Sequence, residues 1–219
     1  GSVLDPIVAI QYRVTLKPYE TITLDMVYGI GGTQEEGQRL VEKYQDKHMI
    51  DRAFELAWTH SQVVLRQINA TAAEALLYCR MAGSIIYANA SFRADPGIIL
   101  KNHREQSGLW SHSISGDFPI VLLQVEDNTN IELVEQMVKA HAFWRQKGLI
   151  VDLVIWNEDH GGYRQVLQNQ ILSLIAPTNV VEEQNRPGSI FVRSADQLSN
   201  EDRILFQTVA RVIISDKLG

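Results

Sequence analysis

The residues best suited to do chemistry gather in one short segment, residues 107–119, which reads SGLWSHSISGDFP. It combines the indole of Trp110, the imidazole of His112, the hydroxyl of Ser115 and the carboxylate of Asp117. An aromatic ring offers an apolar face to the C–H surface of a sugar, and hydroxyl and carboxylate groups bond to sugar hydroxyls. We therefore treat these four residues as a candidate carbohydrate-binding loop. The alternative is a loop that only docks onto the fold.

His112 also lies between two serines, which suggests a nucleophile and its base. Sequence neighbours seldom reach the hydrogen-bond geometry that such a pair needs. We predict no catalytic residue in this loop.

A second polar group follows a buried strand. Asn157 and Glu158 come directly after the apolar run 149–156. Open α/β sheets place ligands at the carboxyl ends of their strands, so these two residues are further candidates for carbohydrate binding. Solvated strand ends are the simpler explanation of these residues.

Asp117 precedes the first strand and Glu158 follows the second. In a parallel sheet this spacing separates the two carboxylates by roughly 20 Å. A glycosidase pair requires about 5–10 Å. The sequence therefore predicts no glycosidase pair.

Composition excludes several other functions. The six histidines and one cysteine show no metal-ligand spacing, so no metal or cofactor is expected. Cys79, in a helical run, is expected to be a buried, inert thiol. Residues 29–32 (GIGG) could form a phosphate-binding turn, but the third glycine of a dinucleotide fingerprint is missing.

Charge and hydropathy also limit the possible partners and location of the protein. The net charge is -6 without a Lys/Arg cluster, so nucleic acid is not expected as a partner. No apolar run approaches the roughly 18–20 residues of a membrane span. A lone cysteine and no signal peptide favour a cytoplasmic location. The strand-like start and the missing tail suggest a piece of a longer chain.

The elements that must hold these residues fall into three parts. Residues 8–16 and 21–30 alternate apolar and polar side chains around a turn at residues 17–20, which predicts a hairpin. Such a hairpin needs a sheet from elsewhere, because two strands alone are marginal. Capping boxes at Thr33 and Thr71 open helices that end near residues 45 and 87, with another helix over 48–67 between them.

From residue 118 the pattern changes to strands separated by whole helices. Strands are expected at 118–125, 149–156 and 189–193, and helices end near residues 147, 175 and 214. Parallel pairing follows, because each connection is a full crossover. Trp144 lies on the apolar stripe of its helix and is predicted to be core.

The predicted fold class is therefore α/β: an N-terminal hairpin that ends a β-sandwich, a helical linker, and a small open parallel sheet with flanking helices. The predicted divisions are residues 3–32, 33–106 and 107–219.

Several motifs together resemble the cyclic β-1,2-glucan synthetases. They read SGLW at 107–110, ISGDFPIVL at 114–122, AHAFWRQKGL at 140–149 and VDLVIWNE at 151–158. AWTHSQ at 57–62 and IFVR at 190–193 also fit, so the resemblance spans nearly the whole chain. Ser113 stands where the family pattern has Gly, and Gln124 where it has Arg.

The resemblance implies a large bacterial parent protein anchored in the inner membrane, which builds β-1,2-glucan from UDP-glucose. Its C-terminal part is similar to the phosphorylases of glycoside hydrolase family 94, with a β-sandwich, a linker and an (α/α)6 barrel. The barrel carries the general acid and the phosphate site. The motifs found here lie before that barrel, so no catalytic residue is carried over to this sequence.

The leading interpretation is thus a non-catalytic scaffold segment whose partners are other domains of its parent chain. The first alternative is a module that binds β-1,2-glucan. The second is an independent α/β enzyme that uses the acids at the carboxyl edge of the sheet.

Overall fold

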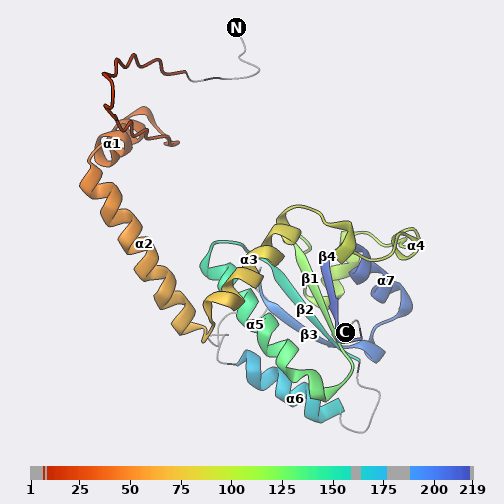
Figure 1. Cartoon of the computed structure of the whole chain (residues 1–219). Helices are drawn as coiled ribbons and strands as arrows, with labels where there is room; N and C mark the ends of the chain where they lie inside the picture. Colours follow the sequence, from red (N-terminus) through yellow and green to blue (C-terminus); the bar gives the residue numbers. More distant parts are fainter. Residues whose placement is uncertain (1–6, 8, 159–163, 177–187, 218–219) are drawn as a thin grey trace. The chain divides into compact units, whose positions relative to one another are not determined.

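A computed structural model describes residues 7, 9–158, 164–176 and 188–217 of the 219. The chain divides into two compact units, Gly1–Trp58 and Thr59–Gly219, which are described separately (Figure 1). The predicted α/β class with a small open parallel sheet is confirmed. None of the described helices has the length and apolar character needed to cross a bilayer.

The first unit contains helix α1 (Gln34–Tyr44) and the start of α2 (Lys47–Gln67). α1 begins at the predicted N-cap residue, Thr33. The Thr33 hydroxyl accepts a hydrogen bond from the Glu36 amide at 3.2 Å, which satisfies an amide that the helix itself leaves unpaired. The Glu36 carboxylate accepts a hydrogen bond at 2.9 Å from the amide of Gly32, one residue before the N-cap, so only half of the predicted capping box forms.

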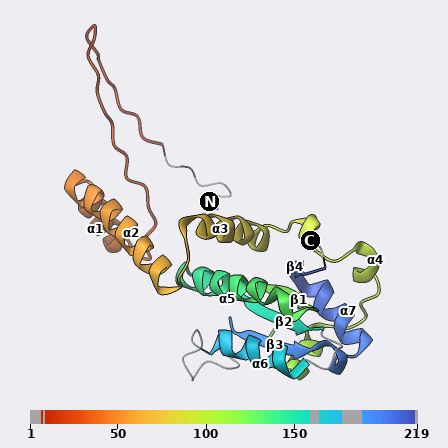
Figure 2. The ribbon, with the colours of Figure 1, turned by 60° about the horizontal axis from the view of Figure 1, so that its bottom comes forward.

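The predicted hairpin takes the form of two extended arms that meet at a tight turn (Figure 2). The Glu20 amide donates to the Lys17 carbonyl at 3.0 Å, and Tyr19 has φ 67°. A positive φ only at the third turn residue, after a proline, is type II geometry. Two-residue hairpins favour types I′ and II′, whose twist matches the strands. Residues 7 and 9–30 accordingly carry no assigned strand.

The side-chain register gives a second reason why the two arms form no hydrogen-bonded β-ladder. With Lys17 opposite Glu20, Leu16 falls opposite Thr21, so the apolar face of one arm meets the polar face of the other. Most apolar side chains of both arms stay exposed, for example Ile10 at 76% and Leu24 at 58%. The arms have amphipathic strand patterns without a sheet to cover them within the described residues.

Four strands form the sheet of the second unit as far as the structure describes it. They are β1 (Ile120–Val125), β2 (Asp152–Asn157), β3 (Ile190–Ser194) and β4 (Ala210–Ser215). Their order is β3-β2-β1-β4, and every neighbouring pair is parallel. β1 and β2 are almost wholly apolar because both faces of the sheet are covered.

Helices α3 (Ala72–Ile86), α5 (Ile131–Gln146) and α6 (Arg164–Ile175) cover one face of this sheet (Figures 1 and 2). Helix α7 (Asn200–Val209) and the 3-10 helix η2 (Gln106–His112) cover the other. Each face has its own apolar core. The connections include the short helices α4 (Pro96–Ile99), η1 (Ala90–Phe92), η3 (Asn128–Asn130) and η4 (Ala195–Gln197).

Trp144 is core, as predicted. Its side chain is 1% exposed, and its indole N–H donates to the Tyr78 carbonyl at 2.8 Å. This bond joins α5 to α3 and satisfies the one polar atom of a buried indole.

The last helix ends earlier than predicted, about five residues before the expected end near residue 214. α7 stops at Val209, and residues 210–215 form β4 beside β1. Val212, Ile213 and Ile214 are β-branched, which favours a strand, and β4 turns alternate side chains to the two cores.

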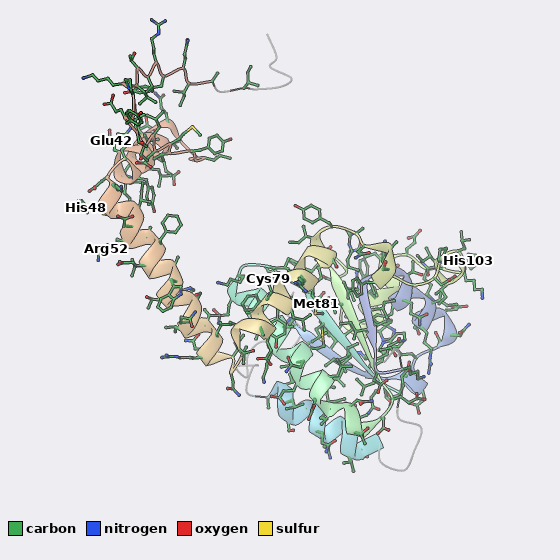
Figure 3. All side chains as sticks on the ribbon, viewed as in Figure 1. Glu42, His48, Arg52, Cys79, Met81 and His103 are labelled. Atoms are coloured by element: carbon green, nitrogen blue, oxygen red, sulfur yellow. The ribbon has the colours of Figure 1, made fainter. Side chains whose placement is uncertain are left out.

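One prediction about side-chain burial is also wrong. Cys79 is exposed on α3 (Figure 3), because the buried face of that helix carries Tyr78 and Ile85. Two large apolar side chains of α2, Phe54 and Trp58, are 72% and 68% exposed. On the same helix Val64 is 1% exposed. An apolar stripe is buried only where the fold supplies a partner surface.

Candidate functional site

The candidate loop is built on η2 and anchored by two apolar residues. Leu109 and Ile114 are each 1% exposed and belong to the core beneath α7. Gly116 has φ 77°, and a Cβ there would lie 2.8 Å from Gln106 Cγ and 2.9 Å from Leu109 Cδ1. The loop thus turns tightly over its own anchors.

Trp110, Ser115 and Asp117 are brought together through Gln106. The Trp110 side chain is mostly exposed, with the residue at 64%, and its Nε1 donates to the Ser115 carbonyl at 3.3 Å. Gln106 Nε2 donates to the same carbonyl at 2.9 Å and to Asp117 Oδ1 at 3.1 Å. The Asp117 amide donates to Ser115 Oγ at 3.2 Å. We call Gln106, Trp110, Ser115 and Asp117 the Trp110 loop cluster.

Sequence reasoning missed Gln106. The only signal was its place one helical turn before Trp110, the spacing at which side chains become neighbours on a helix. Nothing in the sequence showed that residues 106–112 would be helical.

His112, in contrast, points into the fold. Its ring packs edge-on against Phe206 with centroids 5.1 Å apart, and its side chain is 15% exposed. Nε2 lies 3.5 Å from Asp202 Oδ1, longer than a good hydrogen bond. The His112 carbonyl accepts a hydrogen bond from the Arg193 guanidinium. These contacts make His112 an anchor of the loop.

A charged cluster ties the chain before the loop to the start of α7. Arg104 contacts Glu201 at 2.7 Å and Asp202 at 2.5 Å, and the bond to Glu201 raises the pKa of Arg104. Partial burial acts to raise the pKa of Asp202, but the bond from Ser199, the His112 contact and the Arg104 charge together lower it. Asp202 therefore stays ionised, as a helix N-terminus favours.

Buried polar groups lie near the amino end of β2. Asp152 is 1% exposed, and its Oδ1 accepts a hydrogen bond from the Gly188 amide at 2.7 Å. Burial raises the pKa of Asp152, and the Asp117 charge adds to this. His141 Nε2 lies 2.9 Å from the Val151 carbonyl, and burial lowers the pKa of His141. Both side chains bind backbone groups next to β2, so Asp152 and His141 have a structural role.

Asn157 and Glu158 lie at the opposite, carboxyl edge of the sheet. Asn157 is 1% exposed, and its Nδ2 is 3.4 Å from Gln168 Oε1. Glu158 pairs with Lys217 at 3.2 Å, and Lys217 also pairs with Glu126 at 3.1 Å. These two carboxylates raise the pKa of Lys217. The structure does not bring Asn157 or Glu158 near Asp117, because the parallel register places them at opposite ends of the strands.

The crevice between β1 and β4 is the topological switch point of the sheet, where open α/β folds bind ligands. Here Asp216 fills it. Its Oδ2 accepts hydrogen bonds from the Glu126 amide at 2.9 Å, the Asp127 amide at 3.1 Å and Asn130 Nδ2 at 3.2 Å. The chain's own carboxylate thus occupies the donors that a phosphate would use.

One further hollow lies between α3, η1 and β4. This groove of about 410 Å³ is lined by Leu77, Arg80, Met81, Ser84, Phe92, Val212 and Ile214. Apart from Arg80 and Ser84 the lining is apolar, so it lacks the polar groups that sugar hydroxyls need. Among the residues described, no three His, Cys, Asp or Glu side chains could hold a metal ion.

Comparisons of the sequence with known proteins show which proteins this chain resembles. Residues 1–47 match the supersandwich domain family of glycosyl hydrolase 94, the part of the chain that holds the two extended arms and α1. The chain is 30% identical, over 175 residues, to the cyclic beta-(1,2)-glucan synthase NdvB of Rhizobium meliloti (strain 1021). The similarity covers 80% of this chain and 6% of that relative. The resemblance is confirmed: the chain is homologous to a segment of a cyclic β-1,2-glucan synthase.

Proposed function

We propose that the chain is a non-catalytic accessory segment of a cyclic β-1,2-glucan synthase, which orients other domains of its parent protein. The observation that carries the proposal is the filled switch point. Asp216 accepts hydrogen bonds from the backbone amides of residues 126 and 127, and Lys217 forms ion pairs with Glu126 and Glu158. A nucleotide sugar would have to displace both side chains.

The arrangement of carboxylates gives further support. Asp117 and Glu158 lie at opposite ends of the strands, whereas a pair that cleaves a glycosidic bond must lie about 5–10 Å apart. This also disfavours an independent enzyme built on the acids at the carboxyl edge, because Glu126 and Glu158 already share a lysine.

The division into residues 3–32, 33–106 and 107–219 belongs to this proposal. The first part supplies β-sandwich strands, the second a linker, and the third the α/β layer. The cytoplasmic location of the segment and the membrane anchoring of its parent are proposed with it.

Binding of glucan is a second candidate function. It is favoured by one observation, the exposed indole of Trp110 held beside Asp117 and Gln106.

Titration with UDP-glucose tests the scaffold proposal. We expect no saturable heat in calorimetry and no release of UDP, because the switch point is occupied. Saturable binding accompanied by amide shifts at residues 126, 127 and 216 would contradict the proposal. Asp127→Asn is the matched control: it changes the charge beside the crevice while the Asp216 bonds to the backbone remain.

A further inference from the structure

We propose that the Trp110 loop cluster is a surface subsite for a β-1,2-linked glucan chain. The sugar would stack on the Trp110 ring and bond to Asp117 and Gln106. The choice of glucan rests on the proposed function, since it follows from similarity to a β-1,2-glucan synthase.

The first argument is the state of the Trp110 ring. Two of the four tryptophans, Trp144 and Trp156, are each 1% exposed, which is the usual fate of this side chain in a core. Trp110 is 64% exposed, yet it is fixed by its Nε1 bond to the Ser115 carbonyl. A ring that is both exposed and fixed offers its face without losing rotamer freedom when a ligand binds.

The second argument is the free bonding capacity beside the ring. Asp117 accepts one bond from Gln106 at Oδ1, and a carboxylate has about four acceptor positions. Exposed acceptors next to an aromatic face suit the alternating hydroxyl and C–H surfaces of a hexose.

The third argument is rigidity. Leu109 and Ile114 anchor the loop in the core, and Arg193 bonds to the His112 carbonyl from β3. Gly116 allows the tight return that brings Asp117 to Gln106. A site held in its binding geometry loses less entropy on association.

Other ligands fit the cluster less well. The carboxylate of Asp117 repels phosphate and so disfavours nucleotides. Within the described part of the loop Trp110 is a single exposed aromatic, far short of the contiguous apolar patch of several hundred Å² that marks a protein interface. The carboxyl edge is a poorer sugar site because Asn157 is buried and Glu158 is ion-paired.

The test is an NMR titration of the chain with β-1,2-glucooligosaccharides. We expect saturating shifts of the Trp110 indole and of the amides of residues 115–117, with dissociation constants in the millimolar range because the site is shallow. Trp110→Ala should abolish them, and Asp117→Asn should weaken binding at least threefold. Trp58→Phe, which alters the other exposed tryptophan, should leave binding unchanged.

Three outcomes would overturn the subsite: no shift at millimolar sugar, shifts that move instead to Trp58 or α7, and an equal response to β-1,4-linked glucooligosaccharides. Should Trp110→Ala perturb the fold, Gln106→Leu keeps the test valid, because it removes the bridge to Asp117 and leaves the ring. Failure here would leave the scaffold proposal standing, since that proposal is tested by turnover and by UDP-glucose binding.

Discussion

At the scale of single residues, two of the tryptophans differ sharply in burial. Trp144 and Trp110 lie in segments with equally distinctive sequences, but one is 1% and the other 64% exposed. The helical stripe around Trp144 predicted its burial. Trp110 has no such stripe, and its exposure depends on how η2 and Gly116 turn the loop.

Replacing Trp144 should therefore destabilise the second unit strongly. Trp144→Ala removes a buried aromatic ring and its bond to the Tyr78 carbonyl, at a cost of about 3–5 kcal/mol. Urea unfolding measures this cost. Trp144→Phe retains most of the packing and should fall between wild type and Trp144→Ala. A Trp144→Ala variant with an unchanged unfolding midpoint would show that α5 does not pack as described.

At the scale of elements, α3 is joined to α5 by a chain of side-chain bonds. Gln136 donates to Glu74 Oε1 at 2.7 Å and accepts from the Tyr78 hydroxyl at 2.7 Å. The bond from the Thr71 amide and the bond from Gln136 lower the pKa of Glu74 to about 2. Burial, followed by the Glu74 charge, raises the pKa of Tyr78 to about 12.

The lowered pKa makes the contribution of Glu74 depend on pH. A carboxylate with a depressed folded-state pKa stabilises the fold above its ordinary value of 4.5, and this contribution is lost as the pH falls toward about 2. We expect wild type to melt above Glu74→Gln at pH 6 and the difference to vanish near pH 2. The difference is small because Glu74 is only half-buried, so solvent screens its charge. A difference that grows on acidification would contradict the capping-box assignment.

The turn of the Trp110 loop can be tested through its glycine. Gly116→Ala combines a left-handed conformation, which costs about 1–2 kcal/mol, with close contacts to Gln106 and Leu109. Gly148→Ala is the matched control, since Gly148 has φ 82° but nothing within 4 Å of the added Cβ. Thermal melting should show a larger loss for Gly116→Ala. Equal losses would mean that the loop does not pack against Gln106.

The sequence predicted most elements because their local signals agree with the fold. The helix caps at Thr33 and Thr71 and the apolar runs of β1 and β2 all lie where predicted. It did not predict β4, because Ser199 and the acidic first turn mark a helix start while the end of α7 has no glycine or proline. The sequence also did not predict that the two arms would lack a hydrogen-bonded β-ladder, since their register depends on the turn type at Pro18 and Tyr19.

The candidate site was predictable only in part. Trp110, Ser115 and Asp117 are close in sequence and meet in space, whereas Gln106 required knowledge of η2. The roles of Asn157 and Glu158 depend on Lys217 and Gln168, which lie on other elements. Contacts between distant segments leave no periodic signal in one sequence.

At the scale of the whole molecule, three charged side chains among the described residues hold separate parts of the second unit together. Arg104, Asp152 and Asp216 each bind other parts of the chain. The similarity covers 6% of the length of the Rhizobium meliloti synthase, and the supporting role proposed for this chain is consistent with these contacts.

The central claim is tested most directly by incubating the purified chain with β-1,2-glucan and inorganic phosphate and measuring glucose 1-phosphate. The account predicts no release of glucose 1-phosphate above a protein-free blank at any concentration of the chain, and no reducing sugar in the absence of phosphate. Release of glucose 1-phosphate that is proportional to protein and lost in Asp117→Ala or Glu158→Ala would contradict it.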